Sequence, residues 1–330
     1  MSAQDLDDLV QQLSQLSGLK AKRDIQTAAA AFPHHPFAEL GLASCLGDDA
    51  AVVPGQTGSL LLACEGMQPE LVRDDPWFAG WSGVLVNLND IAAMGGRPLA
   101  LVNSVWSAEE QSAAALLEGL RLACDTFAVP MVGGHINSHS PYAALSVSVL
   151  GVADGPVLSA RAAQPGDELM LLIDADGRFY RHYPFWDAAT AAEPSRLQNQ
   201  LALLPRLAQL GLVRAAKDIS MGGLVGTAVM FAEACGLGIT IDLDAIPRPA
   251  QIAEPAWLSC FPSFGFLLAV SSAQIQPLAE QISRHGPLIG AAIGRFNASL
   301  DGVWLERSSQ RQQLWSGTTS LTGFAAVARS

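Results

Sequence analysis

The chain has 330 residues, of which half are hydrophobic and only 15% are charged, and its formal net charge is −12. This length exceeds what one hydrophobic core usually spans, so two domains are expected. The acidic balance excludes general affinity for nucleic acid or for an anionic membrane surface, but it leaves room for a local pocket that binds a small phosphorylated molecule.

Helices and short strands are mixed along the first half. Residues 4–16 and 23–31 are expected to form amphipathic helices. Two β-rich runs on either side of GQTG, residues 55–58, predict a hairpin. Further helices are expected at 76–95 and 107–127, and further strands near 98–106, 129–134 and 142–153.

A domain seam is predicted at GPVLSARAAQPGDEL, residues 155–169, because glycines and prolines bracket a turn before a new strand. The domains are therefore expected to be 1–155 and 156–330. Because the elements lack a strict βαβ rhythm, two α+β domains are favoured over one doubly wound sheet. Beyond the seam, helices are expected near 197–210, 222–236 and 274–285, and strands near 168–173, 238–243, 264–270, 288–294 and 300–306.

The targeting features favour a cytoplasmic protein. The five cysteines are dispersed and form no C-x-x-C pair, which is typical of reduced thiols. The N-terminal stretch is acidic and amphipathic, unlike a secretory signal, and no apolar run reaches membrane-spanning length.

Five acids lie at the edges of apolar elements beside small residues: Asp48, Asp49, Glu65, Asp90 and Asp218. Asp90 is the most informative, because its predicted helix is apolar nearly all round and a buried carboxylate needs a distant cation or a metal ion. Carboxylates that converge from separate elements are typical of Mg²⁺ sites that bridge to nucleotide phosphates. The five together favour such a site.

Four of the five acids also have a structural explanation when taken singly. Asp48 and Asp49 could cap a turn, and Asp218 could cap the helix expected at 222–236. Asp90 could pair with an arginine such as Arg97. These alternatives stay open at the level of the sequence.

Two glycine pairs could hold anions. Gly133 and Gly134 follow a predicted strand, so their N–H groups could approach a phosphate, and His135 could bind phosphate, a metal ion or a substrate proton. The alternative is a β-turn with a solvent-facing histidine. Gly222 and Gly223 stand at a predicted helix N-terminus, which favours an anion but also occurs for plain packing.

Taken in order, the motifs GDDAAVV, NLNDIAAMGGRP, GGH, PGD and DISMGGL resemble those of the AIR synthase (PurM)-like superfamily. This superfamily includes aminoimidazole ribonucleotide synthetase, thiamine-monophosphate kinase, selenophosphate synthetase and a hydrogenase maturation dehydratase. The resemblance runs from about residue 45 to 270 and points to an AIR synthase-related protein rather than to one of these named enzymes. It implies a two-domain α+β fold, in which the N-terminal sheet domain dimerises into a barrel and a second α+β domain follows.

The resemblance also implies ATP- and Mg²⁺-dependent phosphoryl transfer to a small molecule, by a kinase or by a synthetase with a phosphorylated intermediate. The implied metal ligands are Asp48, Asp49, Glu65, Asp90 and Asp218. The candidate catalytic residues are Asp90, Asp218 and His135. The candidate cofactor-binding residues are Asp49, Gly133, Gly134, Lys20 and Lys22.

The chain departs from the superfamily pattern at three places. His135 stands where kinase relatives carry Asp, Met221 replaces the second Asp of DxSDGGL, and CFPSFGFLLAV replaces GGEDYELL. These losses leave open a non-catalytic nucleotide-binding protein that serves as a regulatory or partner subunit.

The departures also suggest a less acidic substrate site. Its lining is expected to include Met221, Phe261, Phe264 and aromatic residues of GRFYRHYPFW, residues 177–186. Arg178, Arg181 or His182 could receive an anionic group of the substrate. Exposed loop residues without a ligand are the alternative.

Overall fold

The computed structural model describes residues 5–31, 46–55, 58–107 and 109–324. The chain forms two compact units. Unit 1 comprises Met1–Asp48, Leu158–Ala191 and Leu210–Ser330, and unit 2 comprises Asp49–Val157 and Ala192–Gln209. In the described part of the chain, no helix combines the length and the apolar character needed to cross a membrane.

The chain passes from unit 2 to unit 1 at residues 157–158. The N-terminal helices belong with the second half, because Leu6, Leu9 and Leu13 are buried in the core of unit 1. Residues 192–209 return to the first half, where α7 packs on α6. The sequence shows that these segments are amphipathic, but it does not show which core receives them.

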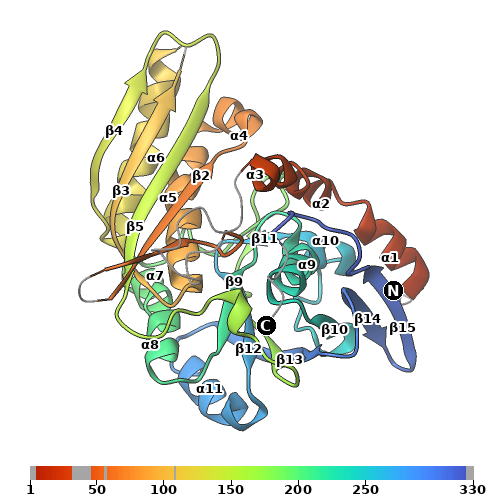
Figure 1. The fold of residues 1–330 in the computed structure, drawn as a ribbon. Coiled ribbons are helices and arrows are strands. Elements are labelled where there is room, and N and C mark those ends of the chain that lie inside the picture. The colour runs from red at the N-terminus through yellow and green to blue at the C-terminus, as the bar shows by residue number, and fades with distance from the viewer. Residues whose placement is uncertain (1–4, 32–45, 56–57, 108, 325–330) are drawn as a thin grey trace. The chain divides into compact units, whose positions relative to one another are not determined.

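Unit 2 is built on a five-stranded sheet in the order β1-β2-β5-β3-β4 (Figure 1). Its pairs are antiparallel except for β3 and β4, which are parallel. The predicted hairpin is confirmed as β1 and β2. The strands are β1 (Ala51–Pro54), β2 (Ser59–Gly66), β3 (Arg97–Trp106), β4 (Met131–Asn137) and β5 (Ala144–Ala153).

The helices of unit 2 include α5, which packs on β2, β3 and β5 and also on α6 (Figure 1). Asp75 caps α5 by accepting a hydrogen bond from Phe78 N at 3.3 Å. Gly119 lets α6 approach α5 closely, since a Cβ there would lie 2.0 Å from the carbonyl oxygen of Trp77. The helices are α4 (Pro69–Asp74), α5 (Pro76–Ala93), α6 (Glu110–Phe127), α7 (Pro194–Leu201) and α8 (Leu203–Gln209).

Unit 1 contains a seven-stranded sheet in the order β15-β14-β10-β13-β6-β12-β9. Most of its pairs are antiparallel, and β10 with β14 is parallel. The strands are β6 (Glu168–Asp174), β9 (Ala215–Asp218), β10 (Gly238–Asp242), β12 (Gly265–Val270), β13 (Leu288–Asn297), β14 (Val303–Arg307) and β15 (Gln310–Trp315). A separate three-stranded sheet joins β7 (Arg178–Phe179), β8 (Phe185–Asp187) and β11 (Phe261–Pro262).

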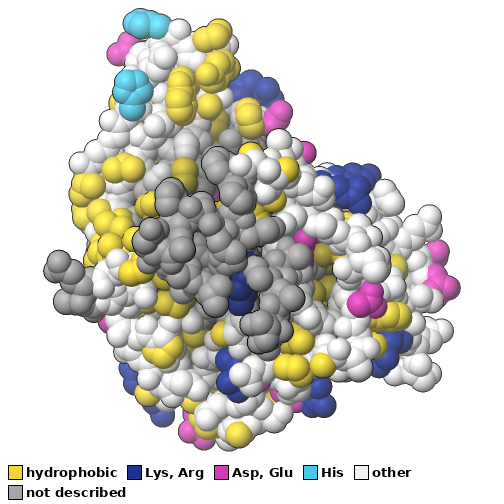
Figure 2. Space-filling model, in the orientation of Figure 1, with side chains coloured by type: hydrophobic (Ala, Val, Ile, Leu, Met, Phe, Trp, Pro, Cys, Tyr) yellow, Lys and Arg dark blue, Asp and Glu magenta, His cyan; other side chains and the backbone are white. Residues whose placement is uncertain are grey.

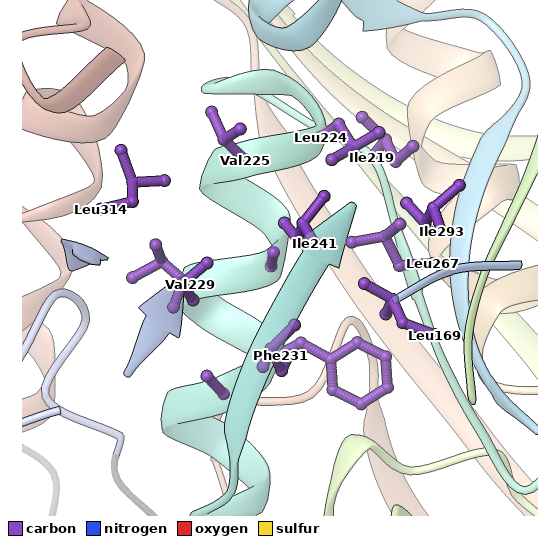
Figure 3. Close-up of a cluster of buried hydrophobic side chains, with 14 of the residues drawn as sticks. Leu169, Ile219, Leu224, Val225, Val229, Phe231, Ile241, Leu267, Ile293 and Leu314 are labelled. Carbon is purple, nitrogen blue, oxygen red and sulfur yellow. The ribbon is translucent and has the colours of Figure 1, made fainter. Parts of the chain in front are cut away.

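The core of unit 1 lies between α9 and the seven-stranded sheet. Figure 3 shows Val229 and Phe231 of α9 near Ile241 of β10 and Leu267 of β12. On another side, α1 packs on β15 and α10 (Figure 1). The helices are α1 (Leu6–Ser14), α2 (Ser17–Lys22), α3 (Ile25–Ala31), α9 (Gly223–Cys235), α10 (Glu254–Ser259) and α11 (Ile275–Ile282).

Two differences from the predicted elements have local causes. The helix expected at 197–210 is split into α7 and α8, because Pro205 lacks the N–H that a continuous helix would need. Strands β7, β8 and β11 were not predicted, because two or three residues are too short to show a hydrophobic period. The mixed, largely antiparallel α+β character is confirmed.

Candidate functional site

Asp48 in unit 1 is held by a turn that lies 111 residues further along the chain. Its carboxylate accepts hydrogen bonds from Ser159 Oγ at 2.5 Å and from Ala160 N at 2.9 Å. Arg161 Nη1 lies 3.5 Å from the same carboxylate, whose side chain is 3% exposed. Asp48 therefore anchors the first turn of the short 3-10 helix Ala160–Ala162, whose N-cap residue is Ser159.

Arg161 and Lys217 also donate hydrogen bonds to backbone carbonyl oxygens just before Asp48. Arg161 Nη2 donates to Leu46 O at 2.6 Å, and Lys217 Nζ donates to Gly47 O at 3.5 Å. Lys217 is 3% exposed. A buried ammonium group is costly unless anions or carbonyls lie nearby, and the carbonyl oxygen of Gly47 supplies one such partner for Lys217.

Asp218 ends β9 and is buried, at 6% exposure. It does not cap the following helix, because the N-cap of α9 is Gly222 and no side chain caps it. Instead, its backbone oxygen accepts from Thr227 Oγ1 at 3.3 Å, which ties the strand to α9. Met221, in the same loop, is half-buried.

The N-terminal arm, residues 5–31 with helices α1 to α3, contacts the loop between Asp218 and α9. Lys22 Nζ donates to Ser220 Oγ at 3.2 Å, and Lys22 is half-buried. Gly18 lies directly against Gly222, since a Cβ on Gly18 would be 2.5 Å from the nitrogen of Gly222. The first turn of α9 is thus packed by α2. Lys20, on the same helix, is exposed.

Asp90 in unit 2 lies on the apolar helix α5 and is 5% exposed, as its pattern predicted. The arginine suggested as its partner is engaged elsewhere, because Arg97 Nε donates to Asp154 Oδ2 at 2.9 Å. Glu65 is exposed near the end of β2, and Asp49, which begins unit 2, is half-buried.

The Gly133-Gly134 pair lies inside β4, which continues to Asn137, and not in a loop after a strand. β4 pairs with β3, and a Cβ on Gly134 would meet the backbone and side-chain oxygens of Asn103 at 2.7 and 2.9 Å. Gly134 therefore permits close packing between two strands. His135 is exposed on this strand.

The carboxylates have the oxygen ligands that Mg²⁺ prefers, so the donor chemistry fits the ion. Their positions do not assemble a centre by themselves: among residues 5–31, 46–55, 58–107 and 109–324, no group of three or more His, Cys, Asp or Glu side chains lies close enough to hold a metal ion.

Sequence reasoning missed three residues that shape this site: Ser159, Arg161 and Lys217. Ser159 and Arg161 stand in the segment interpreted only as a seam, and Lys217 is adjacent to a motif aspartate. The available signal was a lysine directly before the motif aspartate Asp218 and after two alanines, in the strand Ala215–Asp218. Lysine is rarely fully buried unless it is paired, so this position marks Lys217 as chemically significant.

Two family models match the chain, "AIR synthase related protein, N-terminal domain" over residues 47–153 and "AIR synthase related protein, C-terminal domain" over residues 164–303. The chain is 43% identical to the uncharacterized protein sll0787 of Synechocystis, over 97% of this chain and 98% of that protein. It is 26% identical to thiamine-monophosphate kinase of Methanospirillum hungatei, over 79% of this chain and 91% of the kinase.

Among solved structures, T. maritima PurL complexed with ATP matches with a TM-score of 0.71 at 18% identity. The match covers 92% of this chain and 52% of PurL, so the chain spans about half the length of that protein. At this identity the likeness establishes a shared fold.

Proposed function

Because the chain belongs to the AIR synthase related family, we propose that it is an ATP- and Mg²⁺-dependent enzyme that transfers a phosphoryl group to a small molecule. The kinase from Methanospirillum and the ATP complex of PurL support this class of reaction. The product is either a phosphorylated molecule or, in a synthetase, an intermediate that a nitrogen nucleophile then attacks.

The contact between Lys22 and Ser220 is the observation that carries this proposal. It brings an ammonium group from the N-terminal arm onto the loop between Asp218 and α9. Lys217 adds a second, buried ammonium group beside Asp218. Phosphoryl transfer needs positioning and charge neutralisation more than covalent help from the protein, and lysines at such a loop suit phosphate oxygens.

We propose five carboxylates as Mg²⁺ ligands: those of Asp48 and Asp218 in unit 1, and those of Asp49, Glu65 and Asp90 in unit 2. The ion would neutralise the phosphate charge. Asp90 has the strongest support, because it stands in the most specific motif of the resemblance, NLNDIAAMGGRP, and its carboxylate is buried, at 5% exposure. Asp48 has the weakest, because its oxygens already accept two hydrogen bonds.

The roles proposed for the other residues rest on the family resemblance. Gly133 and Gly134 are proposed to approach the nucleotide phosphates, and His135 is proposed to take part in catalysis. Lys20 is proposed to contact the nucleotide beside Lys22. Exposure of Lys20 and His135 leaves both side chains accessible to a ligand.

We also propose that unit 2 forms a homodimer through its sheet. Residues Leu61, Ala63 and Val149 on one face are buried, whereas Leu62 and Leu150, which are register partners on the other face, are 49% and 39% exposed. Val102 adds to this exposed face at 42%. Hydrophobic side chains are visible over these strands in Figure 2. An apolar sheet face of this kind is typical of a buried interface.

Nucleotide turnover tests the proposal. Purified full-length protein is incubated with ATP, Mg²⁺ and candidate acceptor molecules, and ADP release is measured together with the melting temperature. An active enzyme releases ADP and is stabilised by Mg-ATP. Stabilisation without ADP release for any acceptor favours a nucleotide-binding regulatory or partner subunit, whereas no stabilisation overturns the proposal.

A further inference from the structure

The three-stranded sheet of unit 1 carries a group of aromatic side chains that the proposed phosphoryl transfer does not use. Strands β7 and β8 form a hairpin, and β11 pairs with β8 in parallel, so that Phe261 lies opposite Phe185. We call residues 178–187 together with Phe261 the aromatic hairpin.

The aromatic hairpin is firmly anchored on its buried side. Trp186 is 1% exposed, and its Nε1 donates to Asp174 O at 3.0 Å. Its ring packs edge-on against Trp257 and Phe179, at centroid distances of 5.0 and 5.6 Å. The backbone is fixed as well, because Phe261 N donates to Pro184 O at 2.8 Å. Such anchoring fixes the positions of the aromatic side chains on the outer side of the hairpin.

The outer side presents a row of half-buried rings. Tyr183 stacks on Phe185, with the centroids 5.4 Å apart and the planes 10° from parallel. Phe185 meets Phe261 edge-on at 6.1 Å. All three side chains are half-buried, so part of each ring remains accessible. The His182 ring lies against the Tyr183 ring at a centroid distance of 4.2 Å, so a further planar ring would pack against the accessible edges of the row and not on an open end of the stack.

Positive charge borders the row. The segment 177–186 contains two arginines and a histidine but no acid, in a chain whose net charge is −12. Arg178, Arg181 and His182 are all exposed. Two acids flank this segment: Asp176 is exposed, and Asp187, the register partner of Arg178, accepts hydrogen bonds from Ala189 N and Thr190 N of its own turn. The side chains between these two acids carry positive charge only, which favours an anion at that part of the hairpin.

Arg181 has an unusual backbone. Its φ is 51°, which costs free energy for a residue with a side chain, and its guanidinium lies 5.4 Å from the centre of the Tyr180 ring. Strained residues of this kind concentrate at ligand sites. The guanidinium of Arg181 thus lies over the ring of Tyr180, which is three residues before Tyr183.

The aromatic hairpin is also linked to the loop that follows Asp218. Ile219 N donates to Gly265 O at 2.8 Å, just after β11. On the other side of β11, the backbone of Ser259 lies against Gly223, where a Cβ would be 2.4 Å from Ser259 C. The rings and the loop that follows Asp218 therefore belong to one packed part of unit 1.

From these observations we infer that the aromatic hairpin binds a planar ring compound that carries a phosphate or carboxylate group. The ring packs against Tyr183, Phe185 and Phe261, and the anion is received by Arg178 and Arg181. The identification of this compound as the phosphoryl acceptor rests on the proposed function, but the binding itself does not.

The test uses 2-naphthyl phosphate as the probe and follows its fluorescence during titration with the full-length protein, without nucleotide. Saturable binding with a Kd below about 1 mM is expected. Two partial probes separate the contributions: cyclohexyl phosphate lacks the planar ring, and 2-naphthalenemethanol lacks the charge. Each is expected to bind at least about fivefold more weakly.

Variants locate the site. Tyr183→Leu is expected to weaken binding of 2-naphthyl phosphate roughly fivefold, and Tyr183→Phe, which keeps the ring, to preserve it. Arg181→Asn is expected to weaken binding roughly fivefold, since asparagine tolerates the positive φ. The matched controls are Tyr142→Leu and Arg284→Asn, which change exposed residues elsewhere and leave binding unchanged.

Absence of saturable binding overturns the inference, as does a Tyr142→Leu effect equal to that of Tyr183→Leu. The melting temperature with Mg-ATP is measured on the same samples. Protein that binds Mg-ATP but not 2-naphthyl phosphate contradicts the aromatic hairpin alone. Protein that binds 2-naphthyl phosphate but not Mg-ATP contradicts the phosphoryl-transfer proposal alone.

Discussion

Lys22 and Ser220 are 198 positions apart in the sequence, yet the Lys22 ammonium group donates a hydrogen bond to the Ser220 hydroxyl at 3.2 Å. The contact makes the N-terminal arm part of the loop that follows Asp218. If this loop receives phosphate, the arm contributes charge to the site and not only apolar surface.

Replacing Lys22 by methionine keeps the apolar stem and removes the charge. We expect Lys22→Met to weaken Mg-ATP binding about tenfold, because a charge-assisted hydrogen bond to phosphate is lost. Isothermal titration calorimetry measures the change. The exposed Arg206 supplies the control, as Arg206→Met should leave the Kd unchanged. Equal affinities of Lys22→Met and wild type would remove Lys22 from the nucleotide site.

Asp90→Asn keeps the shape of the side chain and removes its charge. We expect ADP release to fall by at least about 100-fold and Mg-ATP to stabilise the variant less, because one carboxylate for the cation is lost. Asp75→Asn is the matched control. Asp75 is 6% exposed at the start of the same helix, and asparagine can still cap it. Full activity in Asp90→Asn would show that Asp90 is not a metal ligand.

Asp48→Ala should act mainly on stability. The substitution removes the acceptor of two hydrogen bonds and leaves Arg161 without this carboxylate, so the free energy of unfolding should fall by about 2–4 kcal/mol. Urea unfolding measures it. Asp154→Ala removes a surface pair with Arg97, in which Asp154 is 45% exposed, and should cost less than about 1 kcal/mol. Similar losses for both variants would contradict the anchoring role of Asp48.

Leu62→Glu should dissociate the proposed homodimer, because it places like charges on the exposed face of the unit 2 sheet. Light scattering after size-exclusion chromatography measures the mass in solution. Leu62 and Leu210 are 49% and 50% exposed, so Leu210→Glu is a matched control that should stay dimeric. A monomeric wild type, or a Leu62→Glu variant that remains dimeric, would rule out this interface.

Burial raises the pKa of the Cys260 thiol from 9.0 to about 12. Above pH 9 the unfolded chain releases this proton while the folded chain keeps it, so the free energy of unfolding falls with rising pH up to about pH 12. The slope is at most about 1.4 kcal/mol per pH unit. Urea unfolding at pH 8 to 10.5 should therefore show a flatter pH dependence for Cys260→Ala than for wild type.

The exposed Cys64 provides the comparison for this prediction. Cys64→Ala should leave the alkaline slope of the wild type intact. If Cys260→Ala retains the full slope, the buried thiol is not its source.

The sequence predicted those helices and turns that are determined by residues close together along the chain. The apolar pattern around Asp90 predicted a buried helix, and α5 follows Pro76 with Asp75 as its cap. The β1–β2 hairpin was accessible in the same way, because it depends on a few adjacent residues.

Contacts between distant segments were not accessible from one sequence. The carboxylate of Asp48 is held by Ser159 and Arg161, and no periodicity connects positions more than 100 residues apart. For the same reason, the sequence does not show that α1 and α2 belong to unit 1. An amphipathic helix shows that it has a buried side, but many apolar surfaces could receive it.

The packing of Gly18 against Gly222 has a consequence for how the protein is made. The leucines of α1 and α2 leave the ribosome before the residues beyond 220. Their place in the core of unit 1 depends on those later residues. At a synthesis rate of roughly 5–20 residues per second, the surface that the arm packs against is completed on the order of ten seconds or more after the arm itself. During that time its apolar side is open to other chains, so early synthesis is the stage at which a chaperone that shields this arm would most improve the yield of folded protein.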